Sequence, residues 1–238
     1  MELFGKCIER GRRSMIKNIC DDSLCTACGA CENSCNFQAI IRTKRKDDSW
    51  YMQIDDTKCK NCNRCLKVCP NNHVPSLYSP QKAYAAWSTD KEIHKKSASG
   101  GIATELYNYA VDKKMYFAGV SMDKNLEAHF ELVNNKNSIE KFQNSKYTFS
   151  YRDCCYQCRY AQRKRTGDLT IADYHGLGKV SVYNGNKESV SCVLVNSEKG
   201  KTLLNKLFEN EQIEVIERPL LEPLQNNFFR RIYVRCFL

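Results

Sequence analysis

The sequence predicts an α+β protein in which a small cysteine-rich domain is followed by a mixed α/β domain. Most of its 15 cysteines lie in the first third of the 238-residue chain. Three prolines, at positions 70, 75 and 80, then interrupt the chain and disfavour helices. Beyond them, segments with the periodicities of strands and helices alternate. We therefore expect an N-terminal extension over residues 1–16, the cysteine-rich domain over 17–78, and the mixed domain in two parts, over 79–150 and 151–238.

Length and composition point to a folded, globular protein. A chain of 238 residues is enough for one large or two small domains, at about 100 to 200 residues per domain. The apolar share of 42% and the net charge of +10 exclude an acidic disordered polymer. The sequence shows no apolar signal core and no run of roughly 18 apolar residues that could span a membrane. We expect a cytoplasmic protein without a membrane span, in which thiols stay reduced and clustered cysteines bind metal.

The cysteines of the first domain obey one repeated spacing. Two runs, 34 positions apart, each place four cysteines at successive steps of three, three and four residues. The first run is Cys25, Cys28, Cys31 and Cys35, and the second is Cys59, Cys62, Cys65 and Cys69. Three thiolates at three-residue steps wrap one face of an iron-sulfur cubane, whereas structural zinc usually takes two separated pairs. The spacing therefore predicts two [4Fe-4S] clusters, with structural zinc or a disulfide framework as the alternatives.

The fourth cysteine of each run is expected to serve the other run's cluster, because the chain leaves its own cube after the third ligand. The first cluster is then held by Cys25, Cys28, Cys31 and Cys69. The second cluster is held by Cys59, Cys62, Cys65 and Cys35. In these features residues 17–75 resemble the bacterial two-cluster ferredoxins, so the first domain is expected to be a bacterial-type two-[4Fe-4S] ferredoxin-like domain.

The region between the two runs contains few apolar residues, so the sequence predicts only a small apolar core in this domain. Residues 39–41 and 50–54 predict two short strands around a polar loop. With so few apolar residues available, we expect the clusters themselves to act as the core of this domain. The protein without iron should then be largely unfolded in this region.

The elements of the mixed domain are predicted from hydrophobic periodicity. Expected strands lie at residues 82–88, 116–121, around 130–132, 191–196 and 214–217. Expected helices lie at 101–113 and 198–209, with Ser197 as the N-cap of the second. The last residues, 226–238, are basic and aromatic, which fits an edge strand, an interface or the scar of a truncation.

A segment rich in serine and glycine precedes the first expected helix. Two adjacent glycines let a backbone approach a ligand closely, and free N–H groups at a helix start favour phosphate. Ser99, Gly100 and Gly101 are therefore candidates to bind a flavin or nucleotide phosphate. The alternative is an ordinary N-terminal helix cap, for which such residues are common.

A second group of cysteines lies in the middle of the chain. Cys154, Cys155 and Cys158 precede a basic run at 159–165 and a strand-like segment at 167–173. Cys155 and Cys158 would form part of an extra metal site. Its remaining ligands would come from another chain or from the other cysteines, which include Cys7, Cys20, Cys192 and Cys236. A redox dithiol and simple burial of these cysteines are the alternatives.

Several later segments together carry a family resemblance. They are residues 95–101 with the helix that follows, 144–147, Cys155 and Cys158 with 167–173, and 193–200. In this order, and after a ferredoxin-like domain, they resemble the family of coenzyme F420 hydrogenase/dehydrogenase beta subunits. This family passes electrons between a flavin and a deazaflavin or ferredoxin. The resemblance implies FAD or another flavin, and a redox protein or a deazaflavin or flavin as electron partner.

The chain departs from this family at two places. Members carry a long segment with a Gly-Thr-Pro-Cys motif between the positions that correspond to Tyr147 and Cys155. In this chain these two residues are only eight positions apart. The central part of the flavoprotein domain is therefore missing, which bears on flavin binding and on any third cluster. His175 stands where the family usually has tryptophan, and a lone histidine in a turn is more often a surface residue than a catalyst. We assign no catalytic residue.

Charge points to a redox partner. Eight ligating thiolates and two cluster cores, at −8 and about +4, reduce the net charge from +10 to about +6. Scattered basic groups, at 10–17, 44–46 and 159–165, suit an acidic redox protein or an anionic cofactor. They do not indicate nucleic acid, for which a reader module is lacking.

We therefore expect an anaerobic iron-sulfur oxidoreductase component, working within a hetero-oligomer. It would relay electrons through two [4Fe-4S] clusters to or from a flavin- or deazaflavin-linked domain. One alternative is a non-catalytic ferredoxin-type electron carrier with a truncated docking domain. The other is a zinc-stabilised nucleic-acid adaptor.

Overall fold

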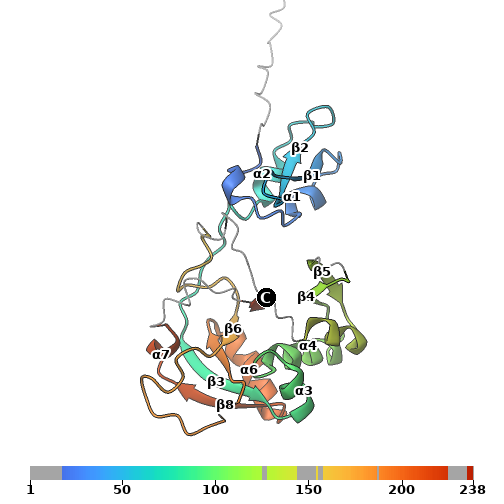
Figure 1. Cartoon of the computed structure of the whole chain (residues 1–238). Helices are drawn as coiled ribbons and strands as arrows, with labels where there is room; N and C mark the ends of the chain where they lie inside the picture. Colours follow the sequence, from blue (N-terminus) through green and yellow to red (C-terminus); the bar gives the residue numbers. More distant parts are fainter. Residues whose placement is uncertain are drawn as a thin grey trace, which may run out of the picture. The chain divides into compact units, whose positions relative to one another are not determined.

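The chain folds into two compact units (Figure 1). The structure is a computed structural model that describes residues 18–124, 128–143, 154, 158–186, 188–224 and 235–237. Unit 1 comprises residues up to Pro75 together with Tyr151–Arg159. Unit 2 comprises Ser76–Ser150 and Tyr160–Leu238. The mixed content of helices and strands confirms the predicted α+β class.

Unit 1 is built of short elements. They are the 3₁₀ turn η1 (Asp22–Leu24), α1 (Ala30–Asn33), β1 (Ile40–Lys44), β2 (Trp50–Ile54) and α2 (Arg64–Val68). β1 and β2 form an antiparallel hairpin in which Ile40 pairs with Ile54 and Lys44 with Trp50. Ile19, Ile40, Met52 and Ile54 supply aliphatic or thioether side chains to the buried cluster of this unit, and three cysteines complete it.

Unit 2 is organised around a five-stranded sheet. Its strands are β3 (Lys82–Ser88), β6 (Leu169–Asp173), β7 (Ser191–Val195), β8 (Ile213–Arg218) and β9 (Arg235–Phe237). The order is β8-β3-β7-β6-β9 and every neighbouring pair is antiparallel. β3 lies between β7 and β8, which come from the C-terminal part of the chain. The parts expected at 79–150 and 151–238 therefore share one sheet. β9 shows that the end of the chain supplies an edge strand.

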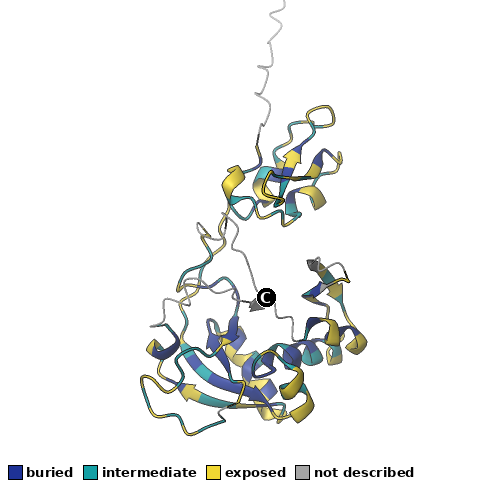
Figure 2. Cartoon of the chain, viewed as in Figure 1, coloured by how far each residue is buried: buried dark blue, intermediate teal, exposed yellow. Residues whose placement is uncertain are grey.

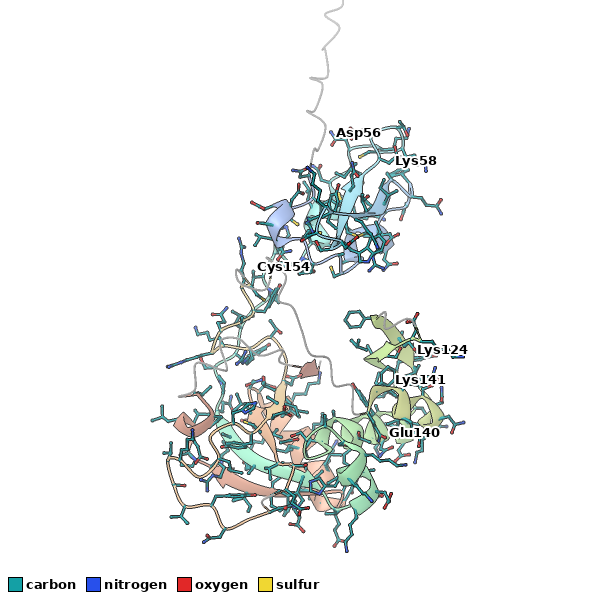
Figure 3. The ribbon with its side chains drawn as sticks, in the orientation of Figure 1. Asp56, Lys58, Lys124, Glu140, Lys141 and Cys154 are labelled. Carbon is teal, nitrogen blue, oxygen red and sulfur yellow. The ribbon has the colours of Figure 1, made fainter. Side chains whose placement is uncertain are left out.

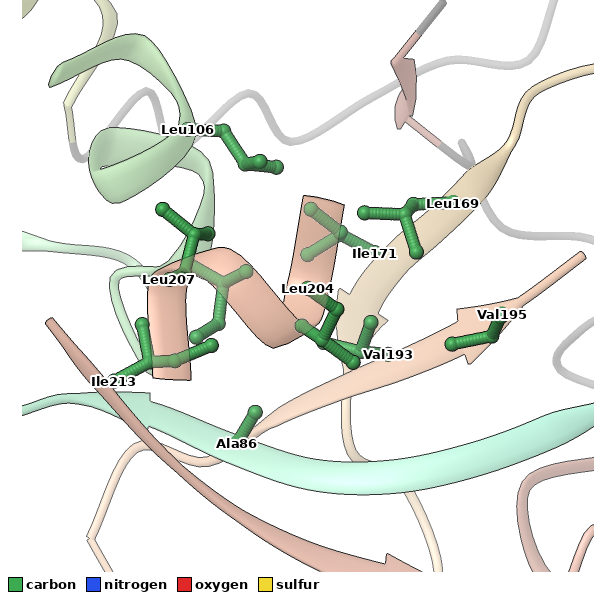
Figure 4. Close-up of a cluster of buried hydrophobic side chains, with 10 residues drawn as sticks. Ala86, Leu106, Leu169, Ile171, Val193, Val195, Leu204, Leu207 and Ile213 are labelled. Atoms are coloured by element: carbon green, nitrogen blue, oxygen red, sulfur yellow. The ribbon is translucent and has the colours of Figure 1, made fainter. Parts of the chain in front are cut away.

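One face of the sheet packs against α4 (Ile102–Asp112) and α6 (Glu198–Glu209). Leu106 of α4 and Leu204 and Leu207 of α6 meet β-strand side chains such as Val193 and Ile213 (Figure 4). The opposite face carries Cys192 and Leu194, which alternate with Val193 and Val195 along β7. Burial is accordingly concentrated in the sheet and in the helix faces turned to it (Figure 2).

Five further elements of unit 2 lie outside this sheet. They are α3 (Lys91–Lys96), β4 (Phe117–Met122), β5 (Ala128–Val133), η2 (Lys136–Phe142) and α7 (Leu221–Leu224). β4 and β5 form a hairpin whose Phe117 stacks on Tyr107 of α4 at a centroid distance of 4.4 Å. α7 follows β8 and supplies Glu222, whose carboxylate is buried against Arg218. The helices expected at 101–113 and 198–209 are thus confirmed to within one residue at each end, while α3 and η2 were not predicted.

Candidate metal centre

The two cysteine runs of unit 1 have the same backbone shape. Ala27 and Asn61, each two residues after the first cysteine of a run, have φ values of 53° and 54°. Gly29 and Asn63, each directly before a one-turn helix, have φ values of 79° and 63°. Left-handed residues at these steps turn successive N–H groups toward one side of the loop, which forms a concave site for anionic sulfur. This repeated conformation costs energy for a non-glycine residue and is concentrated at functional sites.

The first run closes around a pocket with a cysteine from the second run. The pocket is lined by Cys25, Cys28, Cys31 and Cys69, with Ile19, Met52 and Pro70 among its apolar residues. Cys69 reaches it because α2 ends at Val68 and the chain turns to extended backbone at Cys69. A fifth cysteine, Cys20, also lines this pocket.

The second run closes around a pocket of its own. Cys59, Cys62 and Cys65 line it together with Cys35, the last cysteine of the first run. Two backbone N–H groups point at its sulfur atoms: Ala39 N donates to Cys35 Sγ and Asn61 N to Cys59 Sγ, each at 3.4 Å. Such hydrogen bonds stabilise a thiolate and help to set the potential of a cluster. Each pocket thus gathers the four cysteines that the spacing assigns to one cluster.

The pockets favour neutral thiols, and they suit thiolates only when positive charge is supplied. Burial raises the pKa of the Cys31 thiol to about 11, and it raises the pKa of Cys65 as well. Iron would supply the missing charge, because a metal-bound thiol is deprotonated outright. Within the described part of the chain, no three His, Cys, Asp or Glu side chains lie close enough together to hold a single metal ion. A [4Fe-4S] core is larger than one ion and needs four thiolates spread around it, which is the arrangement of each pocket.

The serine and glycine residues before α4 are engaged with the sheet. Ser99 Oγ donates to the Val190 carbonyl at 3.0 Å, and Gly100 N donates to Ser191 Oγ at 2.9 Å. A Cβ atom on Gly100 would collide with the carbonyl oxygen of Ala86, so glycine is needed for this close packing. Gly101 is the left-handed N-cap of α4, with φ of 82°.

A buried carboxyl group lies in the first turn of α4, next to this segment. Glu105, in the first turn of α4, is only 3% exposed and accepts a hydrogen bond from Ser88. Burial raises the pKa of this carboxyl group, which favours its neutral form. The contacts of Ser99, Gly100 and Gly101 are those of helix capping and packing, and their binding of a flavin or nucleotide phosphate stays a prediction.

The later cysteines are divided between the units. Cys154, labelled in Figure 3, is buried in unit 1. It lines a polar hollow with Cys25, Arg45 and other residues. Cys158 is exposed and belongs to the same unit, and the next residue, Arg159, donates to the Asn71 carbonyl at 3.1 Å. Cys192 belongs to the sheet of unit 2, where burial raises the pKa of its thiol.

Other residues of the suggested extra site cannot be placed. Cys155 and Cys7 lie outside the described residues, and of Cys236 only the backbone is described, in β9. His175, in the turn after β6, is partly exposed. The extra metal site at Cys155 and Cys158 thus remains a prediction.

Two family models match the chain. Residues 24–73 match the 4Fe-4S dicluster domain, and residues 83–151 match the N-terminal domain of the coenzyme F420 hydrogenase/dehydrogenase beta subunit. The chain carries both of these domains in that order. The dicluster domain coincides with the two cysteine pockets of unit 1, and the beta-subunit N-terminal domain begins within β3 of unit 2.

Three curated proteins match parts of the chain. A subunit of the F(420)H(2) dehydrogenase of Methanosarcina mazei is 25% identical over 145 residues, which are 56% of this chain and 41% of that protein. The archaeal glutamate synthase [NADPH] of Archaeoglobus fulgidus is 29% identical over 85 residues, 33% of this chain and 16% of that protein. A ferredoxin of Methanocaldococcus jannaschii is 59% identical over 27 residues, 11% of this chain and 18% of that protein. The chain thus spans less than half the length of these relatives.

Among solved structures, a chain of the F420-reducing [NiFe] hydrogenase complex from Methanosarcina barkeri is 15% identical, with a TM-score of 0.41. The match covers 62% of this chain and 85% of that chain. Over the residues that the structure describes, no helix is long and apolar enough to cross a membrane.

Proposed function

We propose that the protein is an electron-transfer component that relays single electrons through two [4Fe-4S] clusters. The observation that carries this proposal is the crossing of the two runs: Cys69 lines the first pocket and Cys35 the second. Three cysteines from one run and the fourth from the other is the ligand pattern of two-cluster ferredoxins, in which two neighbouring cubanes bring two redox centres into one small fold.

The clusters would supply the redox chemistry, and the residues of unit 1 would hold and tune them. Eight thiolates bind the iron. The N–H groups of Ala39 and Asn61 stabilise charge on sulfur, and the apolar lining residues Ile19, Met52 and Ile40 reduce access of water. The second pocket also has cationic residues in its lining, Lys60 and Arg64, which favour the more negative, reduced form of a cluster.

The proposed electron partner is a flavin- or deazaflavin-dependent protein in the cytoplasm, in a hetero-oligomer with this chain. The support is the match to the beta-subunit N-terminal domain and the name of one relative, which is a subunit of a dehydrogenase. Because the central segment of the beta-subunit family is missing between Tyr147 and Cys155, we propose that the flavin is held by the partner. The missing central segment equally favours the other candidate, a carrier without any flavin-linked reaction.

One composition analysis tests these functions. The full chain is purified without oxygen, reconstituted with iron and sulfide, and analysed for iron, acid-labile sulfide, zinc and flavin. The proposal expects about eight iron and eight sulfide per chain and little flavin. Co-purification with a flavoprotein that exchanges electrons with the clusters separates the relay from the free carrier. About two zinc ions and no sulfide would overturn the proposal in favour of a zinc protein.

A further inference from the structure

The first pocket contains one cysteine more than a cluster requires. Cys20 lines it together with the four proposed ligands, Cys69 among them. Cys20 is outside both repeated runs, so the spacing pattern gave it no role in either cluster. The second pocket is lined by four cysteines and has no such additional thiol among its lining residues.

Two asparagine side chains hold Cys20 beside Cys69. Asn72 Nδ2 donates to the Ile19 carbonyl at 2.8 Å, directly before Cys20. Asn71 Nδ2 donates to the Leu24 carbonyl at 2.7 Å and lies 4.0 Å from Cys20 Sγ. Asn71 and Asn72, which follow Cys69, therefore bind the backbone on both sides of Cys20. These contacts keep the thiols of Cys20 and Cys69 at the same pocket.

The thiol of Cys20 has no counterpart in the second half of the internal repeat. Cys20 precedes Cys25 by five residues, and the residue five before Cys59 is Ile54. Ile54 is 8% exposed and packs in the buried cluster of unit 1. An aliphatic residue is thus sufficient for packing at this place in the second half, whereas the first half carries a potential ligand there.

We propose that Cys20 is a reserve ligand of the first cluster, able to take the coordination position of Cys69. This inference rests on the proposed function, since it requires a cluster in the first pocket. In the exchange, Cys20 Sγ loses its proton as its bond to iron forms. The bond from iron to Cys69 Sγ breaks, and Cys69 Sγ takes up a proton, so the oxidation state of the cluster does not change. Among the described residues that line the second pocket, no fifth cysteine could substitute for Cys35.

A matched pair of variants tests the proposal. Cys69→Ala and Cys35→Ala each remove the crossing ligand of one cluster, and alanine cannot bind iron in its place. We expect Cys69→Ala to keep about eight iron per chain and two [4Fe-4S] signals in the electron paramagnetic resonance spectrum of the reduced protein. Cys35→Ala should lose iron and show a three-iron or absent second cluster.

Two further variants complete the test. Cys20→Ala should keep both clusters, and Cys20→Ala combined with Cys69→Ala should lose the first one. If Cys69→Ala alone loses the first cluster as completely as the double variant does, Cys20 is not a ligand and the inference is wrong, although two clusters in the wild-type protein would still support the proposed function. If the wild-type protein has no sulfide, the proposed function itself is wrong.

Discussion

Unit 1 and unit 2 differ in what fills their interiors. The buried cluster of unit 1 has seven members, three of which are cysteines: Cys31, Cys65 and Cys69. The largest buried cluster of unit 2 has ten members, all of them aliphatic, from four strands and two helices. Aliphatic burial stabilises unit 2 without a cofactor, whereas the interior of unit 1 consists largely of groups that gain their full stabilisation only with metal bound.

The largest effect should come from removing iron. When iron and sulfide are removed from the full chain without oxygen, we expect unit 1 to unfold and unit 2 to remain folded. Hydrogen exchange with mass spectrometry should show loss of amide protection in β1 and β2 and unchanged protection in β3 and β7. Equal protection of β1 in the two forms would contradict the idea that the clusters act as its core.

A core substitution in unit 2 should destabilise unit 2 and leave the clusters of unit 1 unaffected. Leu207 is 0% exposed and packs between α6 and the sheet. Leu207→Ala should lower the free energy of unfolding of unit 2 by about 2–5 kcal/mol, because it removes buried methyl groups and leaves a cavity. Iron and sulfide per chain should not change. Phe208→Ala is the control on the same helix, since Phe208 is 52% exposed and its loss should shift the urea midpoint far less.

The same contrast decides what the sequence could predict. The spacing of eight cysteines groups the thiols as the two pockets do, while their role as cluster ligands stays a prediction. Strands and helices with clear periodicity, such as β3 and α6, were also predicted correctly. Cys20 was named only as a possible ligand of the extra site. Its place in the first pocket was missed because it depends on Asn71 and Asn72, whose bonds to Leu24 and Ile19 span 47 and 53 residues. No local pattern encodes contacts of that range.

A buried ion pair in unit 2 was missed for a related reason. Arg218 and Glu222 are four residues apart, a spacing typical of a surface pair on a helix. Here one residue ends β8 and the other lies in α7, and both side chains are buried, at 5% and 0% exposure. The connection through Pro219 and Leu220 turns the two side chains toward each other, which periodicity does not reveal.

Glu222→Gln should weaken unit 2 and change its response to acid. Burial alone would raise the pKa of Glu222, but hydrogen bonds from Arg218 at 2.8 Å and from Tyr174 at 3.0 Å outweigh it and lower the pKa to about 2. A lowered carboxyl pKa stabilises the fold above the unfolded value of about 4.3, and this stabilisation is lost as pH falls toward 2. We expect the glutamine variant to lose roughly 3 kcal/mol at pH 7. Its urea midpoint should then vary less than that of the wild type between pH 6 and pH 3.5, and an unchanged pH dependence would exclude a stabilising role for this carboxylate.

The smallest effect is expected from the ion pair next to it on the same strand. Glu217 precedes Arg218 in β8, and neighbouring residues of a strand point to opposite faces, so Glu217 lies outside and pairs with Lys82 at 2.9 Å. Both side chains are largely exposed, at 57% and 42%, and water and salt screen such a pair. Lys82→Gln should leave the urea midpoint of unit 2 unchanged within error, in low salt and in high salt alike. A shift as large as that of Glu222→Gln would mean that burial is not what separates the two pairs.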